Sequence, residues 1–325
     1  MSTQQHTADV QSRDFFLDTY RYLRGGMAVM IVMLGASVIG ERLSASCWQG
    51  SISAYYYTSA HAIFVAALCA IGAQLIVYKG STDTEDNLLN LAGILAFVVA
   101  LVPTRLPERL CGETPPAVTS GLSITNNVWA VVIAMAGAQV VAWWLYWRAG
   151  GVGHRSLLGE ITVWALRLVI AVGLVGFIFF RDLFYDHAHG VAAAVMFIAI
   201  IITVVITAFL VSKQQSPHKG AYQRAYQIVA ALMGVTLLLV IAVHLAWGWN
   251  HWVIALESAL ILEFAAYWII QTIELWKAPT RLELIPDEMQ PQLAQRREKV
   301  GPTGLVEDIR EMTQYPKDER LMRAL

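Results

Sequence analysis

The stretch that decides the fold is GVAAAVMFIAIIITVVITAFLV, residues 190–211, which carries no charged side chain. A helix needs about 20 consecutive apolar residues to cross a bilayer, and this run is long enough. Seven further apolar runs lie along the chain, at residues 20–40, 60–78, 87–102, 125–147, 158–180, 224–246 and 252–276. The sequence therefore predicts an all-α, polytopic transmembrane bundle of about eight spanning helices.

The composition supports a membrane protein. Of the 325 residues, 57% are hydrophobic and only 14% are charged, and the mean hydropathy is +0.52. Soluble domains are nearer half apolar and a quarter charged, so the lipid bilayer is the expected partner. The net charge is −1 and the chain has no basic tract, which argues against nucleic-acid binding.

Three parts follow from the distribution of polar residues. Residues 1–19 form a polar arm without the layout of a cleaved signal peptide, so we expect the arm to be retained. Residues 20–276 form the transmembrane domain, and residues 277–325 are polar and contain five prolines. We expect the last part to be a partly ordered, mainly solvated tail.

Orientation is predicted from basic residues near the helix ends, because cytoplasmic loops are enriched in Lys and Arg. With the N-terminus inside, thirteen of the basic residues fall on the cytoplasmic side: Arg13, Arg21, Arg24, Lys79, Arg148, Arg155, Lys213, Lys219, Arg224, Lys277, Arg281, Arg296 and Arg297. The four residues on the opposite side are Arg42, Arg105, Arg109 and Arg181. Both termini are thus expected in the cytoplasm of a bacterium, with the chain in its inner membrane.

Two of the three cysteines fall on the outer side in this topology. Cys47 lies between the first and second spans, and Cys111 lies between the third and fourth. The outer side of a bacterial inner membrane is oxidising, so we predict a disulfide bond between them. Cys69 lies inside the second span and is expected to be a packing residue.

Two charged residues lie deep in predicted spans, where each costs about 2.5–3.5 kcal/mol on insertion scales. Arg167 and Glu263 fall at similar depths, roughly 13 Å from the cytoplasmic edge at 1.5 Å per residue. One interpretation is a proton or ion relay that includes Gln74. The other is a structural ion pair that fixes helix packing, which is favoured because one pair without a chain of acids makes a poor relay.

A second polar set gathers at the outer helix ends. Its members are Glu41, Ser51, Ser53, Tyr55, Tyr56, His61, Arg181, Asp182, Asp186, His187, His189, His244, His251 and Glu257. Histidines with carboxylates bind zinc or act as acid and base, and the candidate zinc ligands are His61, His189, His244 and His251. The chain has no tight motif such as His-Glu-x-x-His, and a single interfacial histidine is more often bonded to a carbonyl.

Several motifs resemble a group of polytopic bacterial inner-membrane proteins of unassigned function. The resemblance rests on Ser51-Ile-Ser-Ala-Tyr-Tyr-Tyr-Thr58, Asn90-Leu-Ala-Gly93 and Val99-Ala-Leu-Val-Pro-Thr104. It implies functional positions at His189 and Glu257. Where the group has Arg-Asp, this chain has His61-Ala62. The layout is also distantly similar, by residue types, to the ceramidase and progestin-receptor-like superfamily, whose members build an intramembrane zinc site.

Three functions remain open from the sequence. The first is a pocket that binds a small polar ligand or lipid headgroup through Ser53, Tyr55, Tyr56, His61, His189 and Glu257. The second is a metal-dependent hydrolase of lipid amides or esters, with Glu257 as the catalytic base. The third is a secondary transporter, for which the internal repeats typical of such folds are not evident. We favour binding; the sequence decides neither the oligomeric state nor pH sensing by the histidines.

Overall fold

The computed structural model describes residues 3–107, 111, 121–148, 156–247, 251–290 and 309–325, and all regular secondary structure within them is helical. The long helices are α1 (Thr3–Ala45), α2 (His61–Val77), α3 (Asp83–Leu101), α4 (Gly121–Arg148), α5 (Leu157–Phe179), α6 (Arg181–Ser212), α7 (Lys219–Trp247) and α8 (His251–Glu274). Three short elements are η1 (Ser53–Tyr57), η2 (Arg281–Leu284) and α11 (Lys317–Ala324). Four of the basic residues on which the predicted orientation depends lie outside the described residues: Arg109, Arg155, Arg296 and Arg297.

Seven of the described helices are long and apolar enough to cross a membrane. The remaining one, α2, is a shorter apolar helix of 17 residues. The prediction of an all-helical, multi-pass membrane architecture is therefore confirmed for seven helices.

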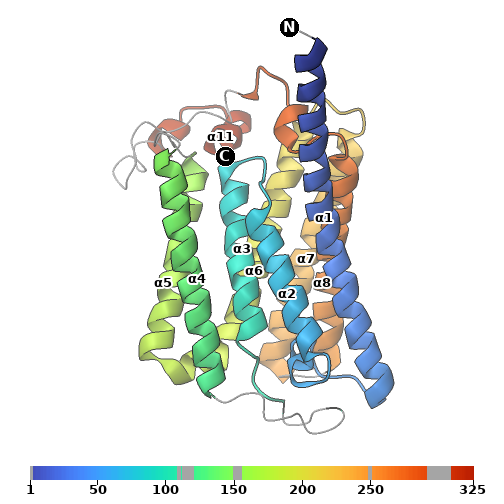
Figure 1. The fold of residues 1–325 in the computed structure, drawn as a ribbon, viewed down its shortest axis with the longest axis vertical. Helices are drawn as coiled ribbons and strands as arrows, with labels where there is room; N and C mark the ends of the chain where they lie inside the picture. Colours follow the sequence, from blue (N-terminus) through green and yellow to red (C-terminus); the bar gives the residue numbers. More distant parts are fainter. Residues whose placement is uncertain (1–2, 108–110, 112–120, 149–155, 248–250, 291–308) are drawn as a thin grey trace.

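Six helices form a closed ring around the main core. Going around the ring, α1, α2, α3, α6, α7 and α8 each pack on the next, and α8 returns to α1. Helix α5 lies outside the ring against α3 and α6, and α4 lies on the same flank (Figure 1). Any site built from α1, α2, α6 and α8 therefore belongs to the ring.

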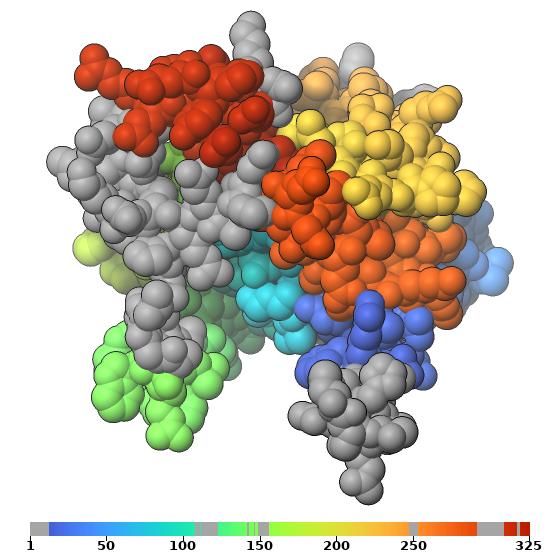
Figure 2. Space-filling model, turned by 90° about the horizontal axis from the view of Figure 1, so that it is seen from above, coloured from blue at the N-terminus to red at the C-terminus, as the bar shows by residue number. Residues whose placement is uncertain are grey.

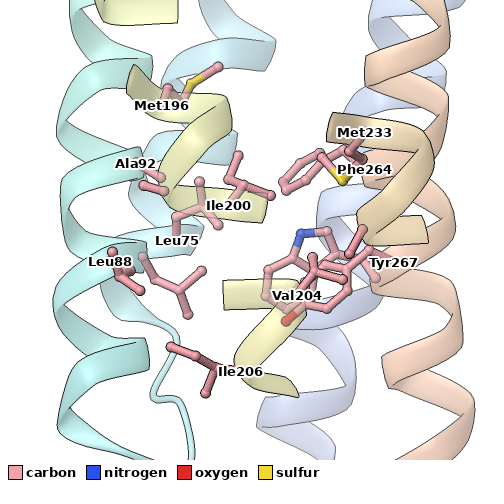
Figure 3. Close-up of a cluster of buried hydrophobic side chains, with 14 of the residues drawn as sticks. Leu75, Leu88, Ala92, Met196, Ile200, Val204, Ile206, Met233, Phe264 and Tyr267 are labelled. Atoms are coloured by element: carbon pink, nitrogen blue, oxygen red, sulfur yellow. The ribbon is translucent and has the colours of Figure 1, made fainter. Parts of the chain in front are cut away.

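The core of the ring is filled by side chains from helices distant in sequence. Leu75, Ala92, Ile200, Met233 and Phe264 come from five different helices and belong to one buried cluster (Figure 3). Helices α2 and α3 approach especially closely, because a Cβ atom on Gly93 would lie 2.6 Å from the carbonyl oxygen of Gly72. Only glycine fits at this crossing without moving the backbone.

A buried arginine binds the segment that follows α8. The guanidinium of Arg24, on α1, donates to the carbonyl oxygens of Leu275 (2.9 Å), Ala278 (3.2 Å) and Pro279 (2.7 Å). These carbonyls belong to the turn after the helix, and buried carbonyl oxygens need hydrogen-bond donors, which the guanidinium supplies. Arg24 thus ties the segment after α8 to α1.

The start of α1 and the C-terminal helix α11 lie at the same end of the bundle (Figure 1). Viewed onto that end, residues 309–325 and the segment after α8 cover part of the bundle (Figure 2). Met322 and Leu325 are buried in the main core cluster, and Thr84 donates to the carbonyl of Leu325 at 3.4 Å. The prediction of a mainly solvated tail is thus corrected for residues 309–325 and for the segment after α8, because apolar side chains of both pack into the bundle.

Candidate functional site

The opposite end of the bundle is closed by the turn η1, which joins the segment after α1 to α2. Its residues Tyr55, Tyr56 and Tyr57 are buried and pack in a second core cluster with Leu34 of α1 and Ile254 of α8. Burial of three consecutive aromatic rings holds this short turn against the helix ends. The turn therefore presents Ser53 at a fixed position.

Ser53 is held by a histidine from α6. The Oγ atom of Ser53 lies 2.8 Å from Nε2 of His189, and Nδ1 of His189 lies 2.7 Å from the carbonyl oxygen of Val102. A carbonyl only accepts hydrogen bonds, so we assign the proton to Nδ1, and the Ser53 hydroxyl then donates to Nε2. His189 is 4% exposed, whereas Ser53 is half-buried.

Glu257 of α8 joins the same turn from the other side. Its Oε2 atom accepts a hydrogen bond of 2.6 Å from the backbone N–H of Ile52, the residue before Ser53. The side chain is half-buried. A carboxylate has about four acceptor positions, so this bond leaves capacity for another donor. Ser53, His189 and Glu257 thus converge from η1, α6 and α8.

The remaining members of the predicted pocket stay close to η1. Nδ1 of His61 lies 2.7 Å from the carbonyl oxygen of Tyr56, and the two rings pack edge to face at 4.3 Å. The buried hydroxyl of Tyr55 approaches the Gln49 backbone without a hydrogen bond of normal geometry. Burial raises the pKa of Tyr55 and Tyr56, so both phenols stay protonated donors at neutral pH.

The candidate zinc ligands do not form a common centre in the described residues. Both ring nitrogens of His189 are already engaged in hydrogen bonds. His61 is hydrogen-bonded to Tyr56 of η1, and His244 lies in the last turn of α7. The side chain of His251 lies outside the described part. No group of three or more His, Cys, Asp or Glu side chains that could hold a metal ion occurs among the described residues.

An apolar pocket lies at the same end of the bundle, between the segment after α1 and the first turns of α8. It has a volume of about 440 Å³ and is lined by Cys47, Trp48, Ile254, Ala255 and Ser258. On α8, Ile254 and Ser258 stand three residues before and one residue after Glu257. The pocket is therefore lined by the same turns of α8 that carry Glu257, although neither Glu257 nor Ser53 lines it.

One wall of this pocket is fixed by the predicted cysteine pair. Cys47 and Cys111 lie at disulfide distance, with their Cα atoms 5.8 Å apart, as the sequence predicts. Gln49 reinforces the link, because its amide donates to the Cys111 carbonyl at 2.8 Å and accepts from the Cys111 N–H at 3.2 Å. Trp48 is held between these two anchors.

The predicted pairing of Arg167 with Glu263 inside one chain is wrong. The Arg167 guanidinium lies over the ring of Trp164 at 5.1 Å, and Glu263 accepts a hydrogen bond from Thr236 at 2.9 Å. The depths are similar, but α5 lies outside α3 and α6, whereas α8 is on the other side of the ring beside α1 and α7. Depth along a helix does not specify position around the bundle.

A buried polar network at the tail end was not anticipated from the sequence. Arg281, just after α8, is 1% exposed and lies 3.0 Å from Glu274 and 3.9 Å from Glu85. The Tyr226 hydroxyl donates to Glu274 at 2.5 Å. Burial lowers the pKa of Arg281, but Glu274, Tyr226 and Glu85 outweigh burial and raise it above its ordinary value.

Little in the sequence indicates this network. Arg281 falls in a Pro-containing polar segment, and Glu85 and Glu274 stand at helix ends, where charged side chains are usually solvated. Both carboxylates are satisfied by hydrogen bonds inside the protein. Glu85 accepts from the Ser81 N–H and from Thr207, and Glu274 accepts from Gln214 as well as from Tyr226. The network therefore anchors the segment after α8 to the bundle.

The cluster at η1 and the apolar pocket have no counterpart from which a role can be transferred. Comparison with protein-family models, with curated proteins and with solved structures finds no match.

Proposed function

We propose that the chain crosses the inner membrane of a bacterium eight times, with both ends in the cytoplasm. Both chain ends lie at one end of the bundle (Figure 1), which supports an even number of crossings. Helix α2 has 17 residues and is about 26 Å long at 1.5 Å per residue, close to the thickness of the hydrocarbon core. The bias of Lys and Arg toward the tail end supports the orientation.

We propose further that the outer end of the protein binds an amphiphile with an amine-bearing headgroup, such as phosphatidylethanolamine. The observation that carries this proposal is the hydrogen bond from Ile52, the neighbour of Ser53 in the chain, to half-buried Glu257, which lies on the same turns of α8 that line the apolar pocket. A carboxylate and a hydroxyl suit an ammonium group, and the apolar wall suits the adjoining hydrocarbon. His189 serves to hold the Ser53 hydroxyl in place.

The orientation of the cluster also suits a headgroup ligand. In the proposed topology, η1 and the first turns of α8 lie at the outer membrane surface, where headgroups lie. The phenols of Tyr55 and Tyr56 line the same turn, and tyrosine is enriched at this level of membrane proteins. A lipid would enter sideways from the bilayer with its headgroup level with Glu257.

The test is native mass spectrometry of the detergent-purified protein with added phosphatidylethanolamine or phosphatidylglycerol. We expect Glu257→Gln to reduce bound phosphatidylethanolamine by roughly tenfold, because hydrogen bonds to charged groups contribute about 1.5 kcal/mol or more. Binding of phosphatidylglycerol should change little. The amide of the variant can still accept from Ile52, so the turn should remain folded, as a thermal melt would verify.

The matched control is Glu41→Gln, which removes another outer-end carboxylate, one that accepts from Ser59. This variant should bind phosphatidylethanolamine as the wild type does. Equal lipid binding by the wild type and Glu257→Gln, or the same loss in both variants, would contradict a headgroup site at Glu257.

A further inference from the structure

Arg167 is a charged residue that the single chain leaves in an apolar setting. It lies ten residues after Leu157, the first residue of α5, and thus about 15 Å from that end of the helix. Its side chain is exposed, and within the described residues its guanidinium meets only the ring of Trp164. An arginine near the centre of a span costs about 2.5–3.5 kcal/mol on insertion scales, so a carboxylate partner is expected.

Glu263 is the corresponding acid. It lies eleven residues before Glu274, the last residue of α8, and thus about 16 Å from the same end of the bundle. Its Oε1 atom accepts from Thr236 of α7, and its Oε2 atom is buried and has no hydrogen-bond partner in the described structure. The side chain is partly exposed at the seam between α7 and α8.

These two residues cannot meet within one chain, because they occupy opposite flanks. Helix α5 lies outside the ring against α3 and α6, and α8 packs between α7 and α1 (Figure 1). Their depths nevertheless agree to about 2 Å. Two copies in one membrane share the same orientation, so Arg167 of one copy lies level with Glu263 of the partner subunit.

We infer that copies of this chain associate head to tail, with the α5 flank of one copy against the α7–α8 seam of the next. Arg167 pairs with Glu263 of the partner subunit, and the Glu263 side chain turns outward from the seam to reach it. Apolar side chains surround both contact points: Leu168 is 64% exposed beside Arg167, and Leu262 is 65% exposed beside Glu263. This contact joins two different surfaces, so it builds a ring or a row of copies; a two-fold dimer about α5 would oppose two arginines.

The first test is cross-linking between two differently tagged copies that keep both charges. One copy carries Leu168→Cys and the other carries Leu262→Cys, both with Cys69→Ala, while Cys47 and Cys111 remain bonded to each other. We expect a short bis-maleimide to give a covalent product with both tags in native membranes. No such product, although each cysteine reacts with a monofunctional maleimide, would overturn the inference.

A matched control pair uses the same helices at different depths. Val175 of α5 and Ile273 of α8 are 48% and 59% exposed, but their depths differ by about 25 Å along the helices. Copies carrying Val175→Cys and Ile273→Cys should not cross-link to each other. An equal yield from this pair would indicate random collision and would also overturn the inference.

The second test separates the charge pair from a lipid counter-ion. Adding Arg167→Gln, or separately Glu263→Gln, to both copies should lower the cross-linking yield about three- to twentyfold, the range expected for polar contacts between membrane helices. Reversing both charges, with Arg167→Glu and Glu263→Arg in every copy, should restore the yield. If Glu263→Gln leaves the yield unchanged, a lipid phosphate neutralises Arg167 and the proposed pairing is overturned.

Discussion

The two ends of the bundle differ in how their polar groups are satisfied. At the tail end, Arg281, Glu274 and Glu85 are at most 2% exposed and bond to one another and to neighbouring polar side chains. At the other end, Ser53 and Glu257 are half-buried and keep hydrogen-bonding capacity. The difference separates a structural network from a candidate binding site, because a ligand needs groups whose capacity the protein has not used.

The largest expected effect comes from breaking the tail-end network. Arg281→Ala leaves Glu274 and Glu85 buried without their cation, so we expect the free energy of unfolding to fall by about 3–5 kcal/mol. The measurement is unfolding of the purified protein in mixed micelles with increasing denaturing detergent.

The control for this experiment is a tail-anchoring ion pair in water. Arg13 and Glu283 lie 3.0 Å apart with side chains 64% and 40% exposed, so Arg13→Ala should cost less than about 1 kcal/mol. Similar losses in the two variants would mean that Arg281 acts as an ordinary surface charge and that the contrast between the two ends is wrong.

The sequence predicts features that depend on local pattern, and it misses those that depend on position around the ring. Apolar runs mark the spans, and the outer placement of Cys47 and Cys111 predicts their bond. Arg281 resembles any charge in a polar tail, and nothing local reveals that η2 inserts it between α3, α7 and α8.

The same reason explains the mixed outcome for polar pairs. The sequence places Ser53 and Glu257 on one side of the membrane, and this is enough to predict their proximity because η1 packs over the helix ends. The sequence also places Arg167 and Glu263 at one depth, but this is not enough, because two helices of a bundle can share a depth without sharing a contact.

A moderate effect is expected at the end of the bundle that η1 closes. His189→Ala leaves the buried carbonyl of Val102 without its donor and releases the Ser53 hydroxyl, so the unfolding free energy should fall by about 1–3 kcal/mol. His189→Asn, which keeps one donor near Val102, should recover part of this loss. The same micelle titration measures both variants, and an alanine variant as stable as the wild type would show that His189 does not hold the turn.

The smallest effect on stability near neutral pH is expected for Tyr57 of η1, whose contribution depends on pH only in alkali. Burial raises the pKa of Tyr57 in η1 to about 12, with a further contribution from Tyr56, against an ordinary value of 10. Because the folded protein holds this proton more tightly than the unfolded chain, the stabilisation is complete below pH 10 and is lost as pH rises toward 12. In thermal melts of the wild type, the contribution of Tyr57 to stability should therefore be constant from pH 7 to 9 and should fall above pH 10.

The variant Tyr57→Phe also loses the hydrogen bond to the Thr104 carbonyl. Its melting temperature should be lower than that of the wild type at pH 8 but should fall less steeply above pH 10. An equally steep fall in the variant would assign the alkaline transition to groups other than Tyr57.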